Sequence, residues 1–265
     1  MDFHDRVTVT IDDRVAHVLL DRADKMNAID HAMFDALAAA GHYLHDADGV
    51  RCVILSGAGR AFCAGLDLAA MADPAQWGDS SLIERTHGNA NLMQQAAMIW
   101  GKLPVPVIAA VHGVCFGGGL QIASGADIRI VAPDARLCVM ETKWGLVPDM
   151  GGYLLWRGNV RDDVLRELIY THREFGGDEA VQLGFATRVE ADPLAGAWTM
   201  ARQIAATSPQ AIRAAKSLAN RSPDLSADQI LLAESHAQHA LLFSRNQIEA
   251  VRAGMENRPP EFVDP

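Results

Sequence analysis

HGVCFGGGLQIASGADIR, residues 112–129, contains three consecutive glycines directly before an apolar run with helical spacing. A glycine inside a helix costs about 1 kcal/mol relative to alanine, so the triplet indicates that the backbone itself is needed at this helix start. The glycines could allow close packing of the helix against a strand. They could instead leave the N–H groups of Gly118 and Gly119 unpaired at a helix N-terminus, where the helix dipole favours negative charge.

The same stretch excludes two nucleotide-binding motifs. Residue 122 is Ile, so the triplet does not begin a G-x-G-x-x-G dinucleotide fingerprint, and it does not match a P-loop either. An anionic ligand at this helix start therefore has to be recognised in another way.

Strands alternate with helices in the first half of the chain. Two strands at 7–11 and 15–20 are predicted to form a hairpin through the turn Asp12-Asp13. Asp30 can cap a helix that runs to about His45, and a second helix from about Asn89 to Lys102 ends before a proline. Further short strands are predicted at 52–57, 105–113, 127–133 and 136–140. This alternation is typical of an α/β core.

Beyond Pro148 the pattern predicts helices throughout. We therefore expect an α/β core over residues 1–197 and a helical region over 198–265. A polar stretch near 73–85 interrupts the first part.

Composition and charge exclude several classes of protein. The net charge of −10 argues against a nucleic-acid partner or an anionic membrane surface. The N-terminus lacks the pattern of a signal peptide, and no apolar run is long enough to span a bilayer. The four cysteines have no C-x-x-C spacing, so we expect them to be reduced and buried in a cytoplasmic protein. His42 and His45 fit a solvated helix face better than a metal site, and no metal or organic cofactor is indicated.

Three segments together resemble the crotonase, or enoyl-CoA hydratase/isomerase, superfamily. They are ILSGAGRAFCAGLDL (54–68), PVIAAVHGVCFGGGLQIASGADIRI (106–130) and METKWGLVPDMGGYLLW (140–156). The motifs PVIAAVHG-x-C-x-GGG and DIR are most similar to those of the dienoyl-CoA isomerases. The resemblance implies a spiral of ββα units with a helical C-terminal region that forms homotrimers, often paired into hexamers. It also implies an acyl-CoA thioester as the ligand, without a separate cofactor.

The resemblance assigns a pair of backbone donors. The N–H groups of Leu66 and Gly118 would hold the thioester oxygen, on which negative charge collects when an α-proton is removed. The neighbouring Ala64, Gly65 and Gly117 would shape the substrate site.

Arg22 and Lys25 lie next to segments that face coenzyme A in the family, and so does Arg60. These cations could meet the phosphates of coenzyme A, or they could be ordinary surface residues.

Three side chains carry the predicted chemistry. Glu141 matches a catalytic acid of the family, although a strand-end acid can also be a solvated loop residue. Asp149 matches a second acid of the dienoyl-CoA isomerases, although it could simply cap the following helix. Gln121 stands where hydratases have a glutamate and cannot exchange a proton at neutral pH. It could orient a water, bond a substrate group, or satisfy neighbouring polar groups.

Two acids on either side of an acyl chain can move a proton from one carbon to another without adding water. The expected activity is therefore double-bond isomerisation of an enoyl- or dienoyl-CoA. The alternatives are a hydratase with a single catalytic glutamate and a non-catalytic acyl-CoA binder. Specificity for the acyl group is expected to depend on the segment 70–100.

Overall fold

An antiparallel hairpin opens the fold. The computed structural model describes residues 1–72 and 82–265, so most of the polar stretch predicted near 73–85 lies outside the described residues. Strands β2 (Val7–Asp12) and β3 (Val15–Leu20) pair as predicted, with β1 (Asp2–Phe3) at the outer edge. The predicted turn was one residue out of place: Asp13 and Arg14 form it, with φ of 42° and 68°. The favoured two-residue hairpin turn needs positive φ at both positions.

The hairpin extends into a seven-stranded sheet within the described residues, in the order β1-β2-β3-β4-β6-β8-β11. From β3 onward the neighbours run parallel. The central strands β4 (Cys52–Gly57) and β6 (Val107–Val111) are buried along their whole length, as expected for a parallel sheet covered on both faces. The strands that follow β6 in this sheet are β8 (Ile128–Val131) and β11 (Arg188–Val189).

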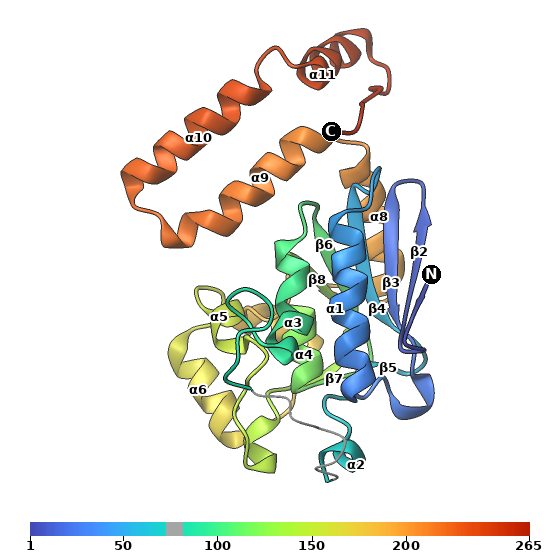
Figure 1. Cartoon of the computed structure of the whole chain (residues 1–265), viewed down its shortest axis with the longest axis vertical. Helices are drawn as coiled ribbons and strands as arrows, with labels where there is room; N and C mark the ends of the chain where they lie inside the picture. The colour runs from blue at the N-terminus through green and yellow to red at the C-terminus, as the bar shows by residue number, and fades with distance from the viewer. Residues whose placement is uncertain (73–81) are drawn as a thin grey trace.

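Helices cover the two faces of this sheet (Figure 1). Helices α1 (His31–His45) and α3 (Leu92–Lys102) lie on one face, and α8 (Pro193–Ala205) lies on the other. The side chain of Asp30 accepts the N–H of Met33 and so caps α1, as predicted. All four cysteines are free and buried, as predicted.

A second sheet brings three strand ends to one edge. Strands β5 (Ala61–Cys63), β7 (Val114–Phe116) and β9 (Arg136–Cys138) run parallel, and β10 (Phe175–Gly176) pairs antiparallel with β9. Ligands of parallel sheets bind beyond the carboxyl ends of the strands. The segments at this edge are 64–66, 117–119 and 139–141, and the second of them begins helix α4 (Gly118–Ser124).

The prediction of helices throughout the chain beyond Pro148 was wrong at two places. Strands β10 and β11 both lie there, each two residues long. A strand of two residues is too short to show a period of its own, so only its pairing partner reveals it. The remaining elements before α8 are the predicted kind, namely α5 (Gly152–Trp156), α6 (Asp162–Thr171) and α7 (Gly177–Leu183).

Helix α8 spans the predicted domain boundary at 197. Its buried Ala197, Ala201 and Ala205 pack against the sheet, so the helix as a whole belongs with the core. After it, α9 (Pro209–Arg221), α10 (Ala227–Leu241) and α11 (Arg245–Glu256) extend away from the sheets as a helical arm (Figure 1). Over residues 1–72 and 82–265, no helix combines the length and hydrophobicity that a membrane span requires.

A buried lysine fastens this arm to the core. Lys216 of α9 donates from Nζ to the carbonyl oxygens of Trp100 (3.3 Å) and Val105 (2.8 Å). It also forms an ion pair with Asp127 at 2.8 Å, and Asp127 accepts the N–H of Val107. One ammonium group therefore joins α9, the end of α3 and the start of β6.

We expect Lys216→Met to lower the free energy of unfolding by about 2–3 kcal/mol, because it leaves buried carbonyl oxygens and a carboxylate without their partner. The value lies at the low end for a buried pair because the Asp127 side chain is 25% exposed. Urea unfolding at fixed protein concentration measures the change. Lys25→Met removes an exposed cation and serves as the matched control; equal effects of the two substitutions would contradict the anchoring role.

Candidate active site

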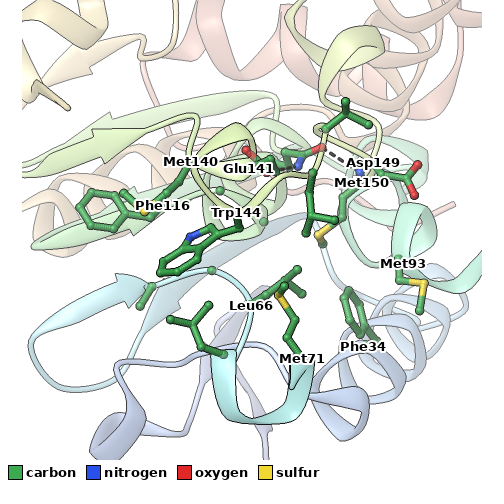
Figure 2. Close-up of a pocket in the computed structure, with 18 of the residues that line it drawn as sticks. Phe34, Leu66, Met71, Met93, Phe116, Met140, Glu141, Trp144, Asp149 and Met150 are labelled. Atoms are coloured by element: carbon green, nitrogen blue, oxygen red, sulfur yellow. Dashed lines mark hydrogen bonds between the residues drawn. The ribbon is translucent and has the colours of Figure 1, made fainter. Parts of the chain in front are cut away.

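A largely apolar cavity of about 620 Å³ opens where β5, β7 and β9 end (Figure 2). Within the part of the chain that the structure describes, the polar side chains that line it are those of Gln121, Glu141 and Asp149, together with backbone of the segments 64–66 and 117–118. Such a cavity suits an apolar ligand that a few polar groups orient. The apolar lining includes Met26, Phe34, Met71, Met93, Phe116, Met140, Trp144, Val147 and Met150.

Two backbone donors border the cavity. The N–H groups of Leu66 and Gly118 have no hydrogen-bond partner among the residues that the structure describes. Ile29 holds the chain on both sides of Leu66, because its N–H donates to Gly65 O (2.8 Å) and its O accepts the N–H of Asp67 (2.9 Å). The Leu66 N–H is thus fixed in place while it remains available to a ligand.

The glycines serve two different purposes. A Cβ on Gly65, where φ is +88°, would lie 2.8 Å from the carbonyl oxygen of Phe116 and 3.8 Å from Gly118 N. A Cβ on Gly119 would lie 2.5 Å from Cys63 O, so this glycine allows α4 to pack closely against β5. Gly117 and Gly118 line the cavity instead.

Glu141 presents one hydrogen-bonded and one unpartnered carboxyl oxygen. It begins a short 3-10 helix (Glu141–Trp144) and is only 7% exposed, so the solvated-loop interpretation was wrong. Gln121 Nε2 donates to its Oε1 at 2.6 Å, whereas Oε2 has no partner in the described part of the chain. Burial raises the pKa of Glu141, and the bond from Gln121 opposes that rise.

Gln121 is 1% exposed and uses both ends of its amide. Its Oε1 accepts the N–H groups of Met150 and Gly152, each at 2.9 Å, while its Nε2 reaches Glu141. The amide therefore satisfies neighbouring polar groups, which was one of the three interpretations of this residue.

Asp149 lies on another part of the cavity wall, near Met93 and Met150 (Figure 2). It is half-buried, and Gln94 Nε2 donates to its Oδ1 at 3.3 Å. The helix-cap interpretation was wrong, because α5 begins at Gly152 and its N-cap is Gly151. The Asp149 carboxylate is therefore available to the cavity.

Comparison with known proteins identifies the family. The model of the enoyl-CoA hydratase/isomerase family matches residues 10–265. The chain belongs to the enoyl-CoA hydratase/isomerase family.

Relatives within the enoyl-CoA hydratase/isomerase family carry different names. A peroxisomal Delta(3,5)-Delta(2,4)-dienoyl-CoA isomerase of Arabidopsis thaliana is 32% identical over 95% of this chain and 94% of that protein. A probable enoyl-CoA hydratase of Mycobacterium bovis is 31% identical over 98% of both chains. The crystal structure of an enoyl-CoA hydratase from Bacillus anthracis superposes with a TM-score of 0.86 at 27% identity, covering 97% and 98% of the two chains. The predicted crotonase fold is thereby confirmed.

Arg22 lies beside this enoyl-CoA hydratase/isomerase cavity and not in its wall. Its guanidinium donates to Ala28 O (2.9 Å) and Asp67 Oδ2 (2.8 Å), and it lies 3.5 Å from Asp30 Oδ2. Asp67 directly follows Leu66 and caps α2 (Leu68–Met71), so its bond from Arg22 fixes the chain next to Leu66. Lys25 is exposed and precedes Met26, a lining residue.

Sequence reasoning did not find the contact between Gln94 and Asp149. Asn91 and Gln94 form a capping box at the start of α3, a spacing that is visible in the sequence. The same Gln94 side chain accepts from Asn91 N (3.2 Å) and from Arg85 Nη1 (2.9 Å), so its amide is held in one orientation. The capping box was the available indication that the Gln94 side chain is fixed.

Proposed function

We propose that this chain catalyses the double-bond isomerisation of an enoyl- or dienoyl-CoA through an enolate. One observation supports this most directly. Two carboxylates, Glu141 and Asp149, line the same cavity as the N–H groups of Leu66 and Gly118, which no residue of the ranges 1–72 and 82–265 accepts, while residue 121 is an amide.

In the proposed reaction the thioester oxygen accepts hydrogen bonds from Leu66 N–H and Gly118 N–H. Glu141 Oε2 takes a proton from the α-carbon, and the electron pair of that C–H bond moves into the enolate. A second proton, carried by the Asp149 carboxyl in the substrate complex, then goes to a more distant carbon of the acyl chain, where a new C–H bond forms and the double bond shifts. Solvent afterwards takes the proton from Glu141 and returns one to Asp149, so both carboxyls regain their starting state. The two donors stabilise the charge on oxygen, each by about 3–4 kcal/mol in comparable sites.

The hydratase alternative depends on a single carboxylate. Gln121 Oε1 already accepts two backbone N–H groups, and an amide cannot exchange a proton at neutral pH. A nucleophilic water would therefore have Glu141 as its acid-base partner. Relatives named as hydratases support this alternative. The non-catalytic acyl-CoA binder is the second alternative, and it applies if no turnover occurs.

Substrate and subunit contacts complete the proposal. Lys25 is exposed and precedes the lining residue Met26, which supports a role for its ammonium group in binding the phosphates of coenzyme A. On the helical arm the apolar side chains Leu231, Leu232, Phe243 and Met255 are each at least 60% exposed. Second copies of the chain would cover them in a homotrimer, or in a hexamer built from two trimers.

The test is a product analysis with 2-enoyl-, 3-enoyl- and 3,5-dienoyl-CoA. We expect a shifted double bond without a mass gain, lost in Asp149→Asn, because the second carboxyl supplies the proton that the distant carbon receives. A gain of one water from the 2-enoyl substrate, unaffected by Asp149→Asn, would establish the single-glutamate hydratase instead. Acyl-CoA binding without turnover of any of the three substrates would establish the binder.

A further inference from the structure

Gln121 joins Glu141 to the segment that follows Asp149. It touches Glu141 directly, and it touches the N–H of Met150, the residue that follows Asp149. Gly152, its third partner, approaches so closely that a Cβ there would lie 2.8 Å from Gln121 Oε1. One buried amide therefore joins the start of the segment 141–152 to its end.

The orientation of this amide follows from its partners. Two backbone N–H groups point at one end, so that end must be the carbonyl oxygen. A flipped amide would bring its NH₂ group against two donors and would leave Glu141 Oε1 facing an oxygen. The NH₂ group consequently faces Glu141, and Gln121 can only donate to it.

We infer that Gln121 is a positioning residue: it occupies Oε1 of Glu141 and leaves Oε2 as the proton acceptor. It also fixes the position of Glu141 relative to the segment that carries Asp149. This inference rests on the proposed function, in which Glu141 removes the α-proton. The charge state of residue 121 determines how Glu141 ionises. A neutral amide allows Glu141 to ionise independently of residue 121.

A glutamate at position 121 would behave differently. It could still accept both backbone N–H groups, but its other oxygen would lie about where Nε2 now stands, 2.6 Å from Glu141 Oε1. Two carboxylates at that separation share one proton, and they titrate as a pair. Glu141 would then hold its proton to a higher pH than in the natural chain.

The experiment measures the titration of Glu141 without turnover. Protein labelled with ¹³C at the glutamate carboxyl carbons is titrated by NMR, and the Glu141 signal is assigned by its loss in Glu141→Gln. We expect Gln121→Glu to raise the Glu141 midpoint by about one pH unit or more. Gln121→Met removes the donor and is expected to raise it as well. The acidic limb of kcat/KM should move in the same direction.

Gln95→Glu is the matched control. Gln95 is a buried glutamine of α3 that contacts His42 and Lys102 and is not part of the cavity wall. Gln95→Glu therefore adds the same negative charge as Gln121→Glu, but outside the cavity wall. A Glu141 midpoint that stays unchanged in both Gln121 variants would overturn the inference, as would an equal rise in Gln95→Glu. Because the titration needs no substrate, a chain that lacked isomerase activity could still give the expected shifts. In that case the activity assay would contradict the proposed function, and the titration would still support the contact between Gln121 and Glu141.

Discussion

Glu141→Gln is expected to lower kcat/KM on the preferred enoyl-CoA by about 10³–10⁴-fold, because it removes the group that takes the α-proton. Glutamine is almost the same size, so acyl-CoA binding should persist. Steady-state kinetics and calorimetric binding on the same preparation measure the two quantities. Glu167→Gln, on the surface of α6, is the control for loss of a carboxylate.

The pH dependence of the natural chain provides a second check on Glu141. Burial raises its pKa, so the ionised base forms at a higher pH than for an exposed glutamate. The value of kcat/KM should therefore rise with pH through a midpoint above 4.5.

A raised carboxyl pKa means that the folded state binds the proton more tightly, so the Glu141 contribution to stability is lost as pH rises through this window. Glu141→Gln should thus unfold no more easily than the natural chain at pH 7, and normal activity in this variant would exclude Glu141 as the base.

Gly65→Ala is expected to lower kcat by about 10²–10³-fold, because it displaces the proposed donors of the thioester oxygen. The added Cβ would lie 2.8 Å from Phe116 O, and the backbone there cannot move without shifting Leu66 or Gly118. The left-handed φ of +88° adds strain of about 1–3 kcal/mol. Kinetics and thermal unfolding separate the two effects.

Gly158→Ala is the matched control for Gly65→Ala. Its φ is +82°, yet a Cβ there would meet nothing within 4 Å, so it introduces similar backbone strain away from the cavity. We expect it to lower stability and leave kcat unchanged. Equal losses of kcat in the two variants would show that strain alone is responsible, and would contradict the role of Gly65 in placing the donors.

Local patterns in the sequence predicted much of the fold because the relevant interactions are short in range. The hairpin β2–β3, the Asp30 cap of α1 and the buried strands β4 and β6 each depend on residues within a few positions of one another. The hairpin turn was misplaced by one residue because either Asp12-Asp13 or Asp13-Arg14 could supply the two turn positions. Strands β10 and β11 were missed because their pairing partners lie far away in sequence.

The candidate site was predictable as a set of residues and not as a network. Glu141, Asp149, Leu66 and Gly118 could be proposed from motifs, and all four line one cavity. The partners of Gln121 could not be proposed, because it meets Glu141 and Gly152 across 20 and 31 residues of chain. Arg22 illustrates the same limit, since only the folded chain brings its guanidinium to Asp67.

The use of a main-chain donor at position 66 has a consequence for how the site tolerates mutation. Every replacement of Leu66 except proline keeps the N–H, so the side chain there is free to change with the acyl group while the proposed anchor for the thioester survives. Position 118 differs, because a Cβ there would lie within 3 Å of Met150 Sδ and Ile29 Cδ1, so a larger residue requires these two side chains to shift. Of the two donors, the one at position 66 therefore tolerates any side chain except proline, whereas the one at position 118 tolerates a larger residue only if its neighbours repack.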